Sequence, residues 1–192
     1  LVAPYYNKPS QQGLYEHYKK IAEDVDIPQI IYNIPSRTGI NVEAETIVKL
    51  AKIENIVGVK EASGNLNQVM QIIKQTDEDF LLISGDDSLT FPILALGGVG
   101  VISVAANLVP DKIAKMVNAF FEGDIKASRD IHYELMPLFK ALFMETNPSP
   151  AKAAMELLGR PAGKPRLPLV EVRPETREKL RKVLADLGLV SK

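Results

Sequence analysis

The chain has 192 residues, of which 46% are hydrophobic and 24% are charged, and it contains no cysteine. This composition is typical of one globular domain or slightly more. The net charge of −1 does not indicate a nucleic-acid or membrane partner. The absence of cysteine excludes disulfides and thiolate metal sites and favours a cytoplasmic location. The two histidines, His17 and His132, are too far apart in sequence to indicate a zinc site.

Short apolar runs recur along the first part of the chain, each followed by a polar turn and a segment of helical periodicity. The apolar runs predict strands at residues 1–5, 29–34, 56–60, 80–84 and 99–105. They lack a clean alternation of apolar and polar residues, as is typical of a parallel sheet buried on both faces. About five βα units in series indicate an α/β fold, either a doubly wound sheet or a (β/α)8 barrel.

Helical periodicity fills the segments between these strands and then continues alone. The intervening helices are expected at residues 10–24, 43–52, 66–75, 88–96 and 110–122. Ser10 is a good helix N-cap, and Pro110 suits a first helical turn. After Gly123 no further strand is predicted, and helices are expected at residues 124–144, 150–158 and 174–187. The sequence therefore predicts an α/β part over residues 1–123 and an all-helical part over residues 124–192.

Polar residues directly follow the predicted strands, where parallel α/β folds collect their functional groups. Lys60 comes at the end of the run Ile-Val-Gly-Val. A partly desolvated lysine has a lowered pKa, and its neutral amine can attack a carbonyl to form a Schiff base. The alternative is that Lys60 extends to solvent or pairs with Glu61.

Two more residues are candidates for substrate chemistry. Tyr32 ends the second predicted strand, where a phenol could relay protons, although a tyrosine packed in the core would also fit. Arg37 lies in Pro-Ser-Arg-Thr-Gly, which is predicted as a loop, and could bind a carboxylate through two hydrogen bonds or simply be a surface residue. Asp86 and Asp87 resemble paired carboxylates, but the sequence favours a helix cap there because no third metal ligand is evident.

Several motifs in a fixed order resemble one known family, the dihydrodipicolinate synthases. The matching segments are Pro-Tyr-Tyr-Asn-Lys-Pro-Ser at residues 4–10, Tyr-Asn-Ile-Pro-Ser-Arg-Thr-Gly at 32–39, Gly-Val-Lys-Glu-Ala-Ser-Gly-Asn at 58–65, Ser-Gly-Asp-Asp at 84–87, Gly-Val-Ile-Ser-Val at 100–104, Glu-Thr-Asn-Pro-Ser-Pro at 145–150 and Arg-Leu-Pro-Leu at 166–169. Ordered motifs spread over the whole chain are far more specific than any single motif.

This resemblance implies the C-terminal part of a (β/α)8 TIM barrel, with strands four to eight of the family fold in residues 1–123, followed by a C-terminal helical domain. It implies a lyase of the class I aldolase type that condenses pyruvate with L-aspartate 4-semialdehyde in lysine and diaminopimelate biosynthesis. No cofactor and no metal are implied. The expected assembly is a homotetramer.

The resemblance also assigns roles to individual residues. Lys60 would form the Schiff base, Tyr32 would relay protons, and Tyr6 would extend the relay into the site of the neighbouring subunit. Arg37 would hold the carboxylate of the semialdehyde. Gly85 and Ile102 would line the pyruvate pocket.

One motif of the family has no counterpart in this sequence. The family's early strands carry Gly-Thr-Thr-Gly-Glu, which supplies a relay threonine and backbone donors for the pyruvate carboxylate. Its absence leads us to expect an incomplete, inactive fragment that needs a complementary N-terminal segment. Two alternatives remain open: an N-acetylneuraminate lyase-like aldolase, which shares the lysine and the tyrosine, and a non-catalytic half-barrel that serves as an interaction module.

Overall fold

The structure is a computed structural model that describes residues 1–160 and 162–191. These residues form two compact units, Leu1–Ile102 and Ser103–Lys192. None of the described helices combines the length and the hydrophobicity needed to cross a membrane. The division of the complete fold at residue 123 stays a prediction.

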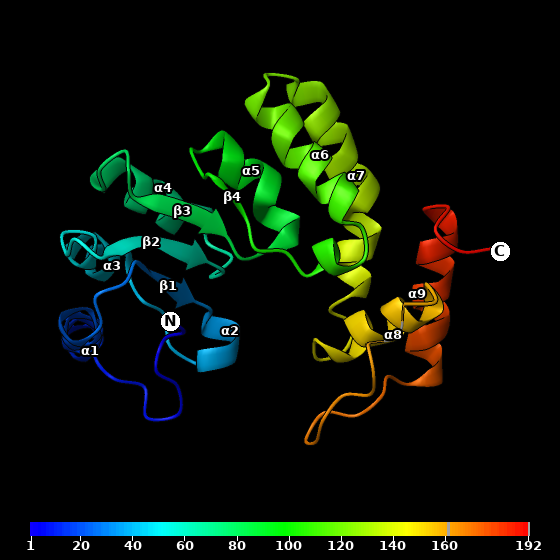
Figure 1. The fold of residues 1–192 in the computed structure, drawn as a ribbon, viewed down its shortest axis with the longest axis horizontal. Coiled ribbons are helices and arrows are strands. Elements are labelled where there is room, and N and C mark those ends of the chain that lie inside the picture. Colours follow the sequence, from blue (N-terminus) through cyan, green and yellow to red (C-terminus); the bar gives the residue numbers. More distant parts are fainter. Residues whose placement is uncertain (161, 192) are drawn as a thin grey trace. The chain divides into compact units, whose positions relative to one another are not determined.

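The first unit is built on a parallel sheet whose strands lie side by side in chain order (Figure 1). The strands are β1 (Gln29–Asn33), β2 (Ile56–Glu61), β3 (Leu81–Ser84) and β4 (Gly100–Val101). The register places Tyr32 beside Lys60, and Lys60 beside Ile83. Gly58 allows β2 and β3 to approach, because a Cβ atom there would lie 2.5 Å from the carbonyl oxygen of Leu81.

Helices alternate with the strands along the chain, and the first helix precedes β1. They are α1 (Gln11–Asp24), α2 (Pro35–Thr38), α3 (Ala44–Leu50), α4 (Leu66–Gln75), the 3₁₀ helix η1 (Asp87–Leu89) and α5 (Thr90–Ala95). The side chain of Ser10 caps α1, as the sequence predicts, and the structure shows that the side chain of Asn65 caps α4. Helix α3 packs against α1 and α4. Buried side chains from these helices and from β1 to β3 form one core, which includes Leu14, Ile31, Ile47, Val59, Val69 and Leu82.

Three sequence predictions in this unit were wrong in detail. Residues 1–5 do not form a strand. They pair with β1 at one position only, through an isolated parallel bridge between Val2 and Tyr32. The strand predicted at 99–105 is reduced to β4, although the amides of Val99 and Ile102 still donate to carbonyl oxygens of β3. The segment predicted as a loop around Arg37 is the short helix α2, which ends at Gly39 in the left-handed conformation.

The second unit is helical. It contains the 3₁₀ helix η2 (Ala105–Asn107) and the α-helices α6 (Pro110–Phe121), α7 (Ile125–Ala141), α8 (Ser149–Leu157) and α9 (Pro174–Asp186). Helix α7 packs against α6 and α9, and α9 also packs against α8. The helices predicted from periodicity are therefore present, with ends that differ by a few residues.

Candidate functional site

Lys60 and Tyr32 meet at the carboxyl ends of β2 and β1. They are register partners on neighbouring strands, so their side chains leave the same face of the sheet. The Nζ atom of Lys60 lies 3.9 Å from the centroid of the Tyr32 ring. The structure therefore brings together the two residues that the sequence singled out most strongly.

The environment of Lys60 favours the neutral amine. Partial burial lowers the pKa of Lys60 below its usual value, and the nearby negative charge of Asp87 opposes this shift. Burial has the larger effect because it removes the water that would stabilise an ammonium ion. A lysine in this state can act as a nucleophile more readily than a solvated surface lysine.

Tyr32 remains a phenol that can donate a proton. Its partial burial raises its pKa, and the positive charge of Arg37 lowers it in part. Arg37 is exposed in the last turn of α2, directly after β1. The charge of Arg37 thus acts on the same site as Lys60 and Tyr32, beyond the carboxyl end of β1, where α2 lies in Figure 1.

Because Gly85 has no side chain, there is room beside it for the side chain of Lys60. A Cβ atom at residue 85 would lie 3.0 Å from Cε of Lys60 and 2.9 Å from Cβ of Ala62. The amide of Gly85 donates to the carbonyl oxygen of Glu61 at 2.8 Å, and the amide of Ile102 donates to Ser84 at 2.9 Å. Ile102 itself is 49% exposed at the last residue of the unit.

Tyr6 has an unusual backbone conformation. Its φ angle is 67°, a region that residues other than glycine seldom occupy, and its side chain is 91% exposed. Strained backbone of this kind is often kept where the position of a side chain matters for function. No hydrogen bond or ring contact joins Tyr6 to Lys60 in the described residues, so the site role of Tyr6 stays a prediction.

The interactions of the acidic residues Glu61, Asp86 and Asp87 follow the sequence expectations only in part. Glu61 does not pair with Lys60, because successive strand residues point to opposite faces and the Glu61 carboxylate is hydrogen-bonded elsewhere. Asp86 caps η1 by accepting from the amide of Ser88, as expected. Asp87 is buried and its charge acts on Lys60, a role that only the folded structure reveals.

Metal ligation is not indicated by the side chains. Within residues 1–160 and 162–191, no group of three or more histidine, aspartate or glutamate side chains is arranged to hold a metal ion. His17 is exposed on α1, and His132 is buried within α7.

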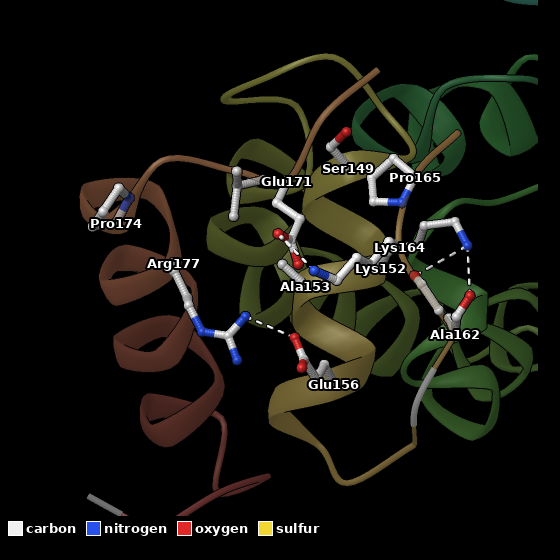
Figure 2. A pocket seen from close by; sticks show the side chains of 12 residues that line it. Ser149, Lys152, Ala153, Glu156, Ala162, Lys164, Pro165, Glu171, Pro174 and Arg177 are labelled. Atoms are coloured by element: carbon white, nitrogen blue, oxygen red, sulfur yellow. Dashed lines mark hydrogen bonds and ion pairs between the residues drawn. The ribbon is translucent and has the colours of Figure 1, made fainter. Parts of the chain in front are cut away.

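The second unit contains a separate pocket of about 340 Å³ between α8, the start of α9 and the preceding segment (Figure 2). Its charged side chains already have partners. Arg177 pairs with Glu156, Lys164 pairs with Glu171, and the Lys152 ammonium donates to the carbonyl oxygens of Ala162 and Gly163. The charged side chains of this pocket are therefore less available to bind a ligand than the polar side chains at the strand ends of the first unit.

Comparison with known proteins decides the family. Residues 1–187 match the model of the dihydrodipicolinate synthetase family. The chain belongs to this family. The match covers both structural units and contains every motif that carried the resemblance in the sequence.

Individual relatives agree with this assignment. A 4-hydroxy-tetrahydrodipicolinate synthase from Archaeoglobus fulgidus is 57% identical over 191 residues, which are 100% of this chain and 66% of the relative. The synthase from Methanosarcina barkeri is 56% identical over 99% of this chain and 66% of its own length. The chain thus spans about two thirds of the length of the curated relatives that it matches.

A solved structure confirms the fold class. The dihydrodipicolinate synthase from Aquifex aeolicus matches with a TM-score of 0.95 and 51% identity over 100% of this chain and 66% of that structure. The parallel sheet followed by helices is therefore a part of the family's barrel fold together with a helical part, as the sequence predicted.

Proposed function

We propose that the complete protein condenses pyruvate with L-aspartate 4-semialdehyde to give 4-hydroxy-tetrahydrodipicolinate, in lysine and diaminopimelate biosynthesis. The observation that carries this proposal is the position of the Lys60 amine, 3.9 Å from the Tyr32 ring centroid at the carboxyl ends of adjacent strands. The names of the curated relatives support the choice of substrates.

Lys60 is the nucleophile in this proposal. Its neutral amine attacks the ketone carbon of pyruvate, and loss of water leaves an imine between Lys60 and the substrate. The lowered pKa of Lys60 supports this step, because a larger fraction of the amine is neutral at a given pH. Proton transfer is needed both to release the water and to form the reactive enamine.

Tyr32 moves these protons in the proposed reaction, and Tyr6 continues the relay from a neighbouring subunit of a homotetramer. The raised pKa of Tyr32 keeps the hydroxyl protonated until it donates. The exposure of Tyr6 leaves its side chain accessible to another subunit. Arg37 binds the carboxylate of the semialdehyde, and Gly85 and Ile102 border the pyruvate site.

Reductive trapping tests this function directly. Borohydride added to the complete protein with pyruvate should leave a pyruvyl-derived mass on the peptide that contains Lys60. Lys60→Arg should abolish the adduct, because arginine stays protonated and cannot form the imine. The exposed Lys49→Arg variant on α3 is the matched control and should be trapped like the unmodified protein. Trapping at a different lysine would contradict the assignment.

Substrate competition tests the aldolase alternatives. A complete protein that cleaves N-acetylneuraminate faster than it condenses the semialdehyde would be a lyase of the related kind. A complete protein that binds no pyruvate would favour a non-catalytic interaction module. We expect neither outcome, and we expect the reaction to take place in the cytoplasm without a cofactor.

A further inference from the structure

A row of buried polar residues crosses the sheet directly beside the candidate site. Asn33, Glu61 and Ser84 are opposite one another on β1, β2 and β3, and their side chains are 0%, 1% and 0% exposed. Each follows a residue of the Tyr32–Lys60–Ile83 row, so the polar row faces away from the Lys60 amine. A carboxylate buried to this degree must be well hydrogen-bonded to remain in the interior.

Glu61 receives hydrogen bonds from three neutral donors. The amide nitrogens Nδ2 of Asn33 and Nε2 of Gln68 each lie 3.0 Å from Oε2 of Glu61. The backbone amide of Ser63 lies 2.6 Å from Oε1. All three partners donate N–H groups, so a group that only accepts hydrogen bonds fits the position.

These donors belong to different elements around the end of β2. Asn33 ends β1, Gln68 lies in the first turn of α4, and Ser63 lies in the connection between β2 and α4. Asn33 also accepts from the amide of Val42 at 3.0 Å, and Gln68 accepts from Nδ2 of Asn41 at 2.8 Å. The carboxylate therefore fixes the end of β2 against the neighbouring strand, the helix that follows and the loop before α3.

We propose that Glu61 is a positioning residue, which holds the backbone of β2 so that Lys60 stays beside the Tyr32 ring. This inference rests on the proposed Schiff-base function of Lys60. Lys60 is the residue before Glu61, and its register partner Tyr32 is the residue before Asn33. The hydrogen bond between Glu61 and Asn33 thus links the two backbones one residue beyond the pair that would do the chemistry.

Glu61→Gln tests whether the carboxylate is needed. Glutamine has the same shape, but its own N–H group would face at least one of the three N–H donors. We expect the rate of Lys60 trapping and kcat/KM for pyruvate to fall roughly ten- to a hundredfold, as a small misplacement of a catalytic group can cause. The KM for the second substrate, which Arg37 is proposed to bind, should change less than twofold, because none of the three donors to Glu61 lies in α2.

A control variant separates positioning from loss of stability. Val69→Ala removes core packing one residue after Gln68 on the same helix and touches none of the donors to Glu61. Both variants are compared at equal fractions folded, measured by thermal unfolding. If Glu61→Gln loses no more trapping rate than Val69→Ala, Glu61 is merely structural and the proposal fails.

Gln68→Leu provides a milder second variant in case Glu61→Gln does not fold. It removes one donor and leaves the carboxylate with Asn33 and Ser63, so a smaller but selective loss in kcat/KM for pyruvate is expected. An unchanged kcat/KM in folded Gln68→Leu would overturn the proposal. Trapping of the unmodified protein at Lys60 is scored first, because its absence would refute the Schiff-base function itself rather than the role of Glu61.

Discussion

Lys60 and Tyr32 are paired in register on adjacent parallel strands, and the Lys60 amine lies against the face of the Tyr32 ring. Their proximity is therefore a property of the sheet and does not depend on a flexible loop. A slip of one residue between β1 and β2 would turn one of the two side chains to the opposite face. The geometry of the proposed chemistry is set by the same hydrogen bonds that build the fold.

The pH dependence of imine formation should reveal the lowered pKa of Lys60. The neutral amine reacts, so the trapping rate should rise with pH and level off around the folded-state pKa, below the value of 10.5 for an unperturbed lysine. Asp87 opposes this shift with its negative charge. Asp87→Asn should therefore move the midpoint of the profile to still lower pH, and a shift to higher pH would contradict the charge interaction. The measurement is the single-turnover trapping rate across pH.

Arg37 should affect the second substrate more than pyruvate. If Arg37 binds the semialdehyde carboxylate as proposed, Arg37→Ala would remove a charge-assisted pair of hydrogen bonds worth about 1.5–3 kcal/mol, and the KM for the semialdehyde should rise roughly 10- to 150-fold. The pKa of Tyr32 should also rise, because the Arg37 charge now lowers it. Arg181→Ala, on an exposed position of α9, is the control. The measurement is steady-state kinetics with each substrate varied in turn. An unchanged KM for the semialdehyde would mean that Arg37 is only a surface residue.

Gly85 should not tolerate even a methyl group. In Gly85→Ala the new Cβ atom would lie within 3.0 Å of both the Ala62 and the Lys60 side chains. Lys60 can move and Ala62 cannot, so the lysine is displaced and overpacking costs about 1–3 kcal/mol of unfolding free energy. Trapping at Lys60 should slow at least roughly tenfold.

Gly13→Ala is the matched control for this substitution. Gly13 lies within α1 and has no strained backbone angle, and alanine is the better helix former by up to about 1 kcal/mol. A Cβ atom at residue 13 would lie 3.3 Å from Cβ of Pro9, a tight contact that offsets part of this gain. Gly13→Ala should therefore keep the trapping rate and lose less stability than Gly85→Ala. If the two alanine variants behave equally in chemical denaturation and in trapping, a methyl group at residue 85 does not crowd Lys60, and the prediction is wrong.

The sequence predicted those features that depend on nearby residues. Ser10 caps α1 by accepting a hydrogen bond from the amide of Gly13, only three residues away. The ends of strands were harder to predict from the sequence, because the pairing of a strand depends on residues far away along the chain. Residues 1–5 are apolar enough for a strand, yet they pair with β1 only through Val2.

The site could be predicted only in part for the same reason. Lys60, Tyr32 and Arg37 were found because each directly follows an apolar run or a turn. The roles of Asp87 and Glu61 depend on partners from other elements, which no local pattern identifies. Glu61 in particular looked like an ion-pair partner of Lys60 in sequence, whereas the alternation of strand side chains places its carboxylate among neutral donors.

The last prediction concerns residues 1–192 produced on their own. The sheet of the first unit ends at β4 on one side and at the Val2 bridge on the other. Leu1, Val2, Val99 and Ile102 are 49%, 47%, 44% and 49% exposed near these edges. Unpaired strand edges with apolar side chains associate with other chains. We therefore expect these residues to self-associate or aggregate, to bind an added segment that completes the sheet, and to show no condensation activity alone. Size-exclusion chromatography with light scattering and a coupled condensation assay measure both properties. A stable monomer with full turnover would contradict the prediction, because it would mean that the edges need no cover and that the chemistry needs only the residues around Lys60.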